Sequence, residues 1–308
     1  MDLTVIVPCY NEEEALPLFY AKVKEVLARE LSGIQTEFLF VDDGSSDRTL
    51  KLLKAFSAKD PCCHFLSLSR NFGKEAAMYA GLKEASGDCC VLMDADLQHP
   101  PVLLPSMYRA VTQEGFDCCA GFRADRTGEG RVRSALSKGF YRVIRRLSHM
   151  DMADGAGDFR MMSRRMVNSI LACQEYNRYM KGIFSFVGFD TKWLPFQNTA
   201  RAAGKTKWKL RGLFRYALDG IFSFSTAPVT LAAAAGTLLF FLALGLGLWT
   251  AVNTLAFGNP VDGWTTIVCL ILFLNGIQLL FISILGEYVS RNYLESKGRP
   301  IYIIKEQG

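Results

Sequence analysis

Two long uncharged segments in the last third of the chain limit its fold more than any other feature. Residues 227–252 and 264–285 contain no Asp, Glu, Lys or Arg. Each segment is longer than the ~20 residues that a helix needs to cross a bilayer. The sequence therefore predicts two membrane-spanning helices, at 227–252 and 264–289, with a pair of buried core helices as the alternative.

Basic residues flank these segments on one side only. The connection 253–263 has neither Lys nor Arg, whereas the charges outside the pair are Lys209, Arg211, Arg215, Arg291, Lys297, Arg299 and Lys305. Because positive charge stays on the cytoplasmic side, both chain ends and the tail 290–308 are expected there. Met1 and Asp2 lead directly into an apolar run, without the features of a signal peptide. The pattern predicts a multi-pass protein of the inner (plasma) membrane.

Residues 1–208 have the pattern of one α/β domain. Apolar runs at 3–7, 37–41, 64–69, 89–93 and 116–121 predict strands, and amphipathic patterns at 13–31, 49–59, 74–86 and 103–114 predict helices between them. Such alternation is typical of a mainly parallel sheet flanked by helices. Ligands of these sheets bind beyond the carboxyl ends of the strands, so the residues that follow each strand are the candidates for chemistry.

Two further segments combine an apolar stripe with basic residues. One covers 209–226, directly before the first uncharged segment, and the other covers 132–147. Helices of this kind lie at a membrane surface. The alternative is that each packs on the domain and turns its basic face to water.

Composition narrows the class of protein. Apolar residues make up 50% of the chain, which excludes disorder. The nine cysteines lack zinc-site spacing and predict buried thiols in a reducing cytosol, without disulfides. His64, His99 and His149 show no metal spacing and are interpreted as ordinary fold or surface residues. The net charge of +5 supports only weak attraction to phosphates, and no nucleic-acid partner is expected.

An Asp-x-Asp arrangement follows the fourth predicted strand, as Asp94-Ala95-Asp96-Leu97-Gln98. Carboxylate oxygens suit Mg²⁺ or Mn²⁺, which keep coordination positions open for the oxygens of a substrate phosphate. Such an ion neutralises the charge that builds up on a departing nucleoside diphosphate. By itself the pattern is equally typical of a turn or a helix cap.

Two more polar loops are expected at the same sheet edge, at 7–13 and 41–47. With the Arg-Asn-Phe-Gly-Lys run at 70–74, these motifs resemble glycosyltransferase family 2 enzymes of the GT-A fold in order and approximate spacing. The resemblance implies a divalent metal ion on Asp94, Asp96 and Gln98. It also implies a nucleotide-sugar site made by Pro8, Tyr10, Glu12, Asp42, Asp43, Lys74, Asp94, Ala95 and Asp96. The residues alone leave open that Asp42 organises the turn at Gly44 and that Asp47 caps a helix.

The later motifs resemble polyprenyl phosphate glycosyltransferases, the group that includes dolichol phosphate mannose synthase and the bactoprenol glucosyltransferases. They lie at 121–123, 131–134, 157–160 and 201–208, and Thr206 stands where the group usually has Ser. The resemblance implies an acceptor phosphate bound by four cations, Arg123, Arg131, Arg201 and Lys207. For Arg201 and Lys207 the alternative partner is the donor diphosphate. Asp158 and Asp96 are the predicted catalytic residues: Asp158 positions or deprotonates the acceptor phosphate, and Asp96 acts through the metal.

The predicted reaction is an inverting transfer of a hexose, glucose from UDP-glucose, to polyprenyl (undecaprenyl) phosphate at the cytoplasmic membrane face. A GDP-mannose or amino-sugar donor is one alternative, and a non-catalytic membrane protein that senses nucleotide sugars is another. A processive synthase would carry Gln-x-x-Arg-Trp, and a dinucleotide-dependent oxidoreductase would carry Gly-x-Gly-x-x-Gly after the first strand. The sequence has neither.

Small residues in the first uncharged segment predict that several copies of the chain assemble. The run 232–236, with Gly245 and Gly247, permits close helix packing, so a homo-oligomer is expected. A two-helix hairpin does not enclose a path for a sugar, so the lipid-linked product is expected to pass to a separate flippase and a second glycosyltransferase.

Overall fold

The computed structural model describes residues 1–123, 156–197, 222–223, 225–257 and 263–308. The chain divides into two compact units, Met1–Gly220 with Arg299–Gly308, and Ile221–Gly298. The helix predicted at 132–147, most of that predicted at 209–226, and the predicted phosphate ligands Arg131, Arg201 and Lys207 lie outside the described residues.

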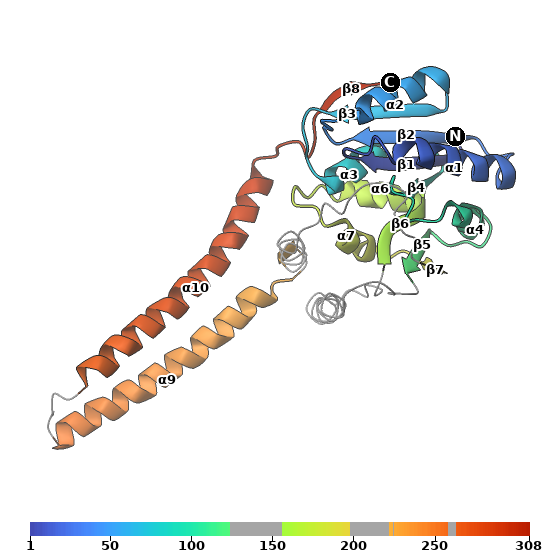
Figure 1. Ribbon diagram of the computed structural model, residues 1–308. Coiled ribbons are helices and arrows are strands. Elements are labelled where there is room, and N and C mark those ends of the chain that lie inside the picture. The colour runs from blue at the N-terminus through green and yellow to red at the C-terminus, as the bar shows by residue number, and fades with distance from the viewer. Residues whose placement is uncertain (124–155, 198–221, 224, 258–262) are drawn as a thin grey trace. The chain divides into compact units, whose positions relative to one another are not determined.

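The first unit is built on an eight-stranded mixed sheet with the order β7-β5-β6-β4-β1-β2-β3-β8 (Figure 1). Its strands are β1 (Leu3–Cys9), β2 (Thr36–Asp42), β3 (Cys63–Leu68), β4 (Cys89–Leu92), β5 (Cys118–Arg123), β6 (Ala156–Ser163), β7 (Thr191–Phe196) and β8 (Ile304–Gln307). The central strands β4, β1, β2 and β3 are parallel, while β6 and β8 run antiparallel to their neighbours. The predicted α/β class is confirmed.

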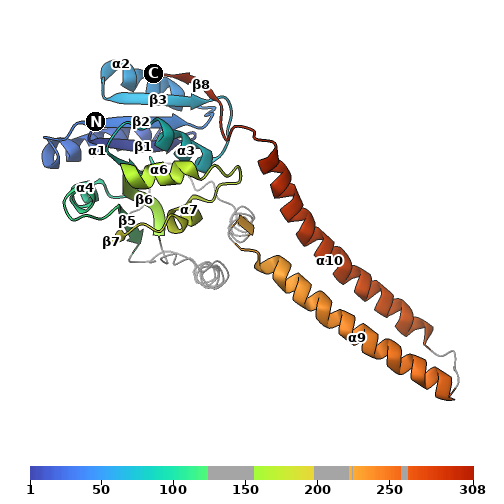
Figure 2. The ribbon, with the colours of Figure 1, turned by 180° about the vertical axis from the view of Figure 1, so that it is seen from behind.

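Helices cover both faces of the sheet, as the two opposite views show (Figure 1, Figure 2). They are α1 (Leu16–Glu30), α2 (Thr49–Lys59), α3 (Lys74–Glu84), α4 (Leu104–Thr112), α6 (Arg164–Ala172) and α7 (Met180–Phe186), with the short 3₁₀ helix η1 (Pro101–Leu103).

Strand β1 shows why both faces are apolar. Val5 and Val7 share a core with Phe19 of α1, while Ile6 points the other way, because successive strand residues alternate between faces. A Cβ at Gly81 of α3 would lie 2.3 Å from Ile6 Cγ2. Glycine at this position therefore permits α3 to pack closely on the sheet.

The carboxyl-terminal residues form a strand that the sequence did not indicate. The predicted tail contains β8, which pairs antiparallel with β3. The Phe65 amide donates to the Gly308 carbonyl at 2.7 Å, and the Ser69 amide donates to the Ile303 carbonyl at 2.9 Å. Lys54 Nζ lies 2.6 Å from Glu306 Oε2. The end of the chain is thus an integral edge of the sheet.

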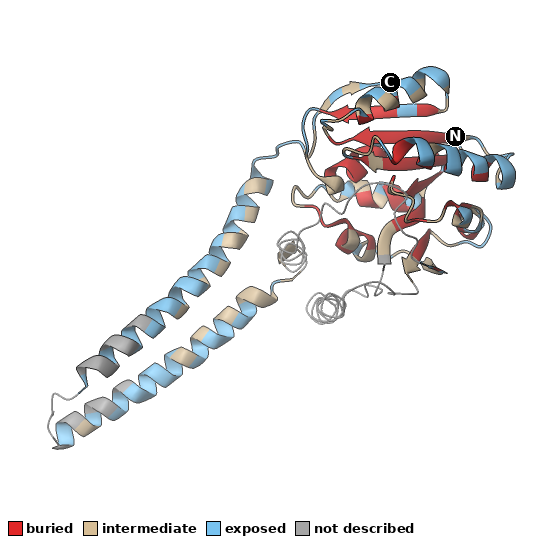
Figure 3. Cartoon of the chain, viewed as in Figure 1, coloured by how far each residue is buried: buried red, intermediate tan, exposed pale blue. Residues whose placement is uncertain are grey.

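Two long apolar helices form the second unit, α9 (Ala227–Phe257) and α10 (Trp264–Ser296). Their candidate membrane-spanning windows, Ala227–Leu246 and Phe273–Ser296, have none of their described residues buried, and Figure 3 shows both helices largely exposed. A surface of this size and apolarity marks an interaction with another molecule or a membrane. The alternative of buried core helices is therefore wrong for the described residues, and the helices indicate association with a membrane.

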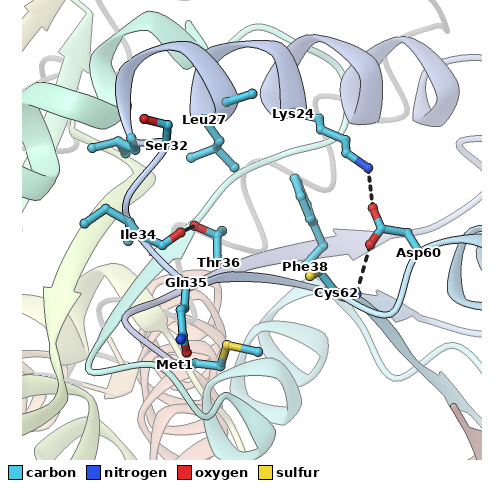
Figure 4. A pocket seen from close by; sticks show the side chains of 12 residues that line it. Met1, Lys24, Leu27, Ser32, Ile34, Gln35, Thr36, Phe38, Asp60 and Cys62 are labelled. Carbon is cyan, nitrogen blue, oxygen red and sulfur yellow. Dashed lines mark hydrogen bonds and ion pairs between the residues drawn. The ribbon is translucent and has the colours of Figure 1, made fainter.

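An ion pair of Asp60, far from the carboxyl ends of the strands, leads to a first prediction. Asp60 accepts hydrogen bonds from Lys24 Nζ and the Tyr20 hydroxyl, and its side chain is 14% exposed. It borders a pocket of about 470 Å³ at the opposite, amino-terminal ends of the strands (Figure 4). The Lys24 and Tyr20 hydrogen bonds lower the pKa of Asp60 from 3.8 to about 2.

Asp60→Asn is expected to lower the free energy of unfolding by about 1–2 kcal/mol at pH 7. Because the pKa is depressed in the folded state, this contribution is complete above 3.8 and is lost as the pH falls through about 2. Thermal melts of the detergent-solubilised protein should therefore show a gap between variant and wild type at pH 7 that narrows toward pH 2. Glu25→Gln, at the exposed Lys22 pair, is the control and should show no gap. A gap that is independent of pH would contradict the assignment.

Candidate active site

Three loops meet at the carboxyl edge of the parallel strands, and hydrogen bonds join two of them. The Asn11 amide donates to Ser45 Oγ at 2.9 Å, the Ser46 amide donates to Asn11 Oδ1 at 2.8 Å, and the Glu12 amide donates to Thr49 Oγ1 at 2.8 Å. Asn11 has a φ of 53°, a left-handed conformation that non-glycine residues rarely adopt. The loops after β1 and β2 therefore form one preorganised wall.

Asp42 and Asp43 are buried inside this wall rather than exposed to a ligand. Asp42 accepts from the Ser45 amide at 3.1 Å and from Ser67 Oγ at 3.0 Å. Asp43 accepts from the amides of Phe72 and Gly73 at 2.7 and 2.9 Å. Burial raises the pKa of Asp43 to about 6, against the effect of these amides. Both carboxylates thus hold loop geometry in this state.

Other residues of these loops can also be placed in the structure. Gly44 has a φ of 68°, and a Cβ there would lie 2.5 Å from the Arg70 carbonyl carbon, so only glycine fits. Asp47 accepts from the Thr49 amide at 2.9 Å and from the Glu13 amide at 3.2 Å, so it joins the two loops, while the N-cap residue of α2 is Arg48. Pro8 lies opposite Val41 in the sheet, and Tyr10 is 39% exposed beyond it.

Lys74, at the start of α3, joins two carboxylates from different strands. Its Nζ lies 2.7 Å from Asp94 Oδ1 and 2.7 Å from Asp158 Oδ2. The register explains the meeting: Leu92 of β4 faces Arg160 of the antiparallel β6, and two residues further on Asp94 comes opposite Asp158. Residues that are more than sixty positions apart in the sequence therefore share one ammonium group.

The charges in this cluster depend strongly on one another. Although burial opposes ionisation, the Lys74 charge holds the pKa values of Asp94 and Asp158 below their usual range. Despite the same burial, the two carboxylates raise the pKa of Lys74 well above its usual value. Asp158 Oδ1 is buried and has no hydrogen-bond partner among the described residues. A ligand that donates a hydrogen bond would satisfy it.

Oxygen donors suited to a hard cation lie on the loop after β4. Leu97 has a φ of 58°, and this turn brings the Gln98 amide to Asp96 Oδ1 at 3.1 Å. Gln98 Oε1 accepts from Arg123 at 3.4 Å, whereas both Asp94 oxygens contact Lys74. Among the described residues, no three His, Cys, Asp or Glu side chains are arranged to hold a metal ion. The donor types fit Mg²⁺ or Mn²⁺, and each of the three predicted ligands has a protein partner: Asp94 contacts Lys74, Asp96 accepts from the Gln98 amide, and Gln98 accepts from Arg123.

Two residues that the sequence did not single out also belong to the site. His99 is 5% exposed and accepts the Asp94 amide on Nδ1 at 3.2 Å. The Met180 amide donates to Glu75 Oε2 at 2.8 Å, which fixes the start of α7, and the adjacent Lys181 charge contributes to the low pKa of Asp158. His99 follows Asp94 by five positions, so proximity in the loop was the available signal. Nothing in the sequence placed Lys181 beside β6.

A sequence profile described as glycosyl transferase family 2 matches residues 4–171, more than half of the chain. The chain belongs to glycosyl transferase family 2. The matched segment contains the loops after β1 to β4 and Asp158, so the predicted resemblance is confirmed. The mixed sheet with flanking helices is the GT-A-like fold expected for the family.

Curated family 2 relatives match along almost their whole length. A bactoprenol glucosyl transferase of Shigella phage SfV is 41% identical over 307 residues, covering 100% of this chain and 99% of the relative. A prophage bactoprenol glucosyl transferase homolog of Escherichia coli K12 is 40% identical over 305 residues, covering 99% of each. The putative glycosyltransferase CsbB of Bacillus subtilis is 40% identical over 306 residues, covering 99% of this chain and 91% of the relative.

Solved structures are more distant. Glucosyl-3-phosphoglycerate synthase from Mycobacterium tuberculosis, in complex with Mn²⁺, UDP-glucose and phosphoglyceric acid, has a TM-score of 0.48 and 20% identity, covering 72% of this chain and 77% of that one.

Proposed function

We propose that this family 2 glycosyltransferase moves glucose from UDP-glucose to polyprenyl (undecaprenyl) phosphate. The full-length similarity to bactoprenol glucosyl transferases supports the choice of sugar and acceptor. The observation that carries the proposal is the contact of one ammonium group, Lys74 Nζ, with Asp94 and Asp158 at 2.7 Å each. This contact links the loop proposed for the donor to the residue proposed for the acceptor.

The nucleotide-sugar site is proposed at the wall formed by the loops after β1 and β2, to which Asp43 bonds the loop after β3. Tyr10 and Pro8 would face the nucleoside, and Glu12, Asp42 and Asp43 would keep the loops in place around it, as their hydrogen bonds support. Ala95 is buried and lets the chain pass close to the sugar phosphate. The nine donor residues named from the sequence thus divide into contact and support roles.

Mg²⁺ or Mn²⁺ is proposed on Asp96 and Gln98, with Asp94 joining when Lys74 moves away. A bound ion would neutralise the charge developing on the departing diphosphate. Gln98 contacts Arg123 at 3.4 Å, so this arginine lies at the boundary between the donor loop and the proposed acceptor phosphate. Arg131, Arg201 and Lys207 are proposed to complete the cationic surface for that phosphate.

Asp158 is proposed to orient the acceptor rather than to remove a proton. A phosphate monoester is already largely ionised near neutral pH, because its second pKa is about 6. Lys74 also holds Asp158 as a carboxylate, and a carboxylate of such low pKa is a weak base. Proximity and charge neutralisation then dominate the rate. A single displacement inverts the anomeric configuration.

The topology proposed from the sequence gains support from β8. Arg299–Gly308 belongs to the same compact unit as residues 1–123, so the chain must return to the side of the membrane from which it left. Two crossings, at 227–252 and 264–289, satisfy this requirement. We therefore retain the catalytic domain 1–208, the interfacial helix 209–226 and a tail 290–308 on the cytoplasmic face. Homo-oligomers, and a flippase and second glycosyltransferase downstream, complete the proposal.

Asp96→Asn should reduce transfer by roughly 100-fold or more, since it removes a charged ligand of the proposed metal ion. The assay supplies purified protein in detergent with UDP-[¹⁴C]glucose, undecaprenyl phosphate and Mn²⁺ or Mg²⁺, and follows label into the lipid phase. Chelation with EDTA should have the same effect. Asp88→Asn, an exposed carboxylate before β4, is the matched control and should behave as wild type. Full activity of Asp96→Asn would overturn the metal assignment.

A further inference from the structure

His99 lies at the junction of three strands of the sheet rather than on the surface. Its Nδ1 accepts the Asp94 amide at 3.2 Å, at the end of β4. Its ring stacks on Phe159 of β6, with centroids 4.9 Å apart and planes at 9°, and meets the edge of Phe196 of β7 at 6.2 Å. One side chain thus touches the backbone of Asp94 and the neighbour of Asp158.

The hydrogen bond fixes the chemical form of the imidazole. An Nδ1 that accepts a hydrogen bond cannot carry a proton, so the proton of the neutral ring resides on Nε2. The ring therefore contacts Asp94 at its backbone amide, and its Nε2 lies 4.0 Å from Asp94 Oδ2.

We propose that His99 is a positioning residue that sets the spacing between Asp94 and Asp158 for glycosyl transfer. The inference rests on the proposed function of this site. The hydrogen bond holds the start of the Asp94–Gln98 loop, and the stacked Phe159 holds β6 one residue beyond Asp158. Lys74 can bridge the two carboxylates only while this separation is kept.

Three substitutions separate the hydrogen bond from the packing. In His99→Asn, the amide oxygen can replace Nδ1 as the acceptor, but the aromatic stack is lost. In His99→Phe, the stack is kept and the Asp94 amide loses its acceptor. In His99→Gln, the amide group reaches the Nε2 position instead of the Nδ1 position. His99→Asn and His99→Phe should therefore rank in opposite order in activity and in stability.

We expect His99→Phe to melt closer to the wild-type temperature than His99→Asn does, yet to lose roughly 10- to 100-fold in kcat, since a small misplacement of reacting groups has effects of this size. His99→Asn should melt lower and keep kcat within roughly threefold of wild type, and His99→Gln should lose kcat as the phenylalanine variant does. If kcat instead follows the melting temperature, with His99→Phe active and His99→Asn inactive, His99 serves packing alone and the proposal is wrong.

A second readout separates this inference from the proposed function. UDP affinity in the presence of Mn²⁺, measured by calorimetry, does not require a productive acceptor or the correct sugar. Wild type and His99→Asn should bind UDP with similar affinity. His99→Phe and His99→Gln should bind it more weakly, because the Asp94 loop is displaced in these two variants. If the wild type fails to transfer any sugar but this order holds, the proposed reaction fails and the role of His99 stands. Equal affinities in all four proteins would overturn it.

Discussion

Lys74→Met is expected to reduce glucose transfer by roughly 100-fold or more, an effect as large as that expected of Asp96→Asn. Without the ammonium group, Asp94 and Asp158 become two neighbouring carboxylates with no shared cation, and they repel each other. The loop after β4 and the start of β6 would then separate. The measurement is kcat and KM for label transfer from UDP-glucose to undecaprenyl phosphate.

Lys83→Met, an exposed lysine on the same helix, is the matched control and should leave both constants unchanged. The double variant Lys74→Met/Asp158→Asn adds a test of the contact, because residues that act as a unit are not additive. It should be no slower than Lys74→Met alone. A double variant whose loss is the product of the two single losses would show that Lys74 and Asp158 act independently.

Deleting residues 299–308 is expected to lower the melting temperature of the protein by roughly 5–10 °C. The deletion removes β8 and exposes the outer backbone groups of β3, including the Phe65 and Ser69 amides. It also removes the contact between Tyr302 and Tyr79 of α3, whose ring centroids lie 6.2 Å apart. An uncovered edge strand of this kind favours aggregation, so light scattering should rise before the melt.

Glu306→Gln separates strand pairing from the surface ion pair with Lys54. Exposed ion pairs contribute little to stability, so this variant should melt as the wild type does. A truncated protein that melts at the wild-type temperature without aggregation would mean that β8 is dispensable for the stability of the sheet.

The sequence predicted the parallel centre of the sheet because its strands are short apolar runs between amphipathic helices. Residues 49–59 were predicted as a helix and form α2 (Thr49–Lys59). The helices predicted at 13–31, 74–86 and 103–114 begin and end within three residues of α1, α3 and α4. Strand β8 was missed because Ile304, Lys305, Glu306 and Gln307 carry mostly polar side chains, and a strand at a sheet edge needs little hydrophobic pattern.

The sequence predicted which residues belong to the site better than it predicted how they are arranged. Asp94, Asp158 and Lys74 were all named, but their meeting depends on the antiparallel register of β6, which no local pattern specifies. Asp42 and Asp43 were expected to hold the donor, and their carboxylates are instead occupied by loop amides and Ser67. Their role as direct ligands remains a prediction.

The role of His99 could not be predicted from the spacing of residues in the sequence. The absence of metal spacing led to its interpretation as an ordinary fold residue, and it is indeed buried. Its function is inferred from a contact with the backbone of Asp94. A hydrogen bond to a backbone amide does not depend on the type of the residue that donates it, so the sequence does not reveal it. The same holds for Lys181, which reaches the site through the hydrogen bond between Glu75 and the Met180 amide.

The central claim is tested most directly by supplying purified protein with Mn²⁺, undecaprenyl phosphate and, in separate reactions, UDP-glucose, UDP-galactose, UDP-N-acetylglucosamine and GDP-mannose. Mass spectrometry of the extracted lipid identifies any product. We predict a hexosyl undecaprenyl phosphate from UDP-glucose and little or none from the other donors. A product from GDP-mannose alone would contradict the assigned donor. No product from any donor, with UDP still bound in the presence of Mn²⁺, would contradict catalysis and favour a nucleotide-sugar sensor.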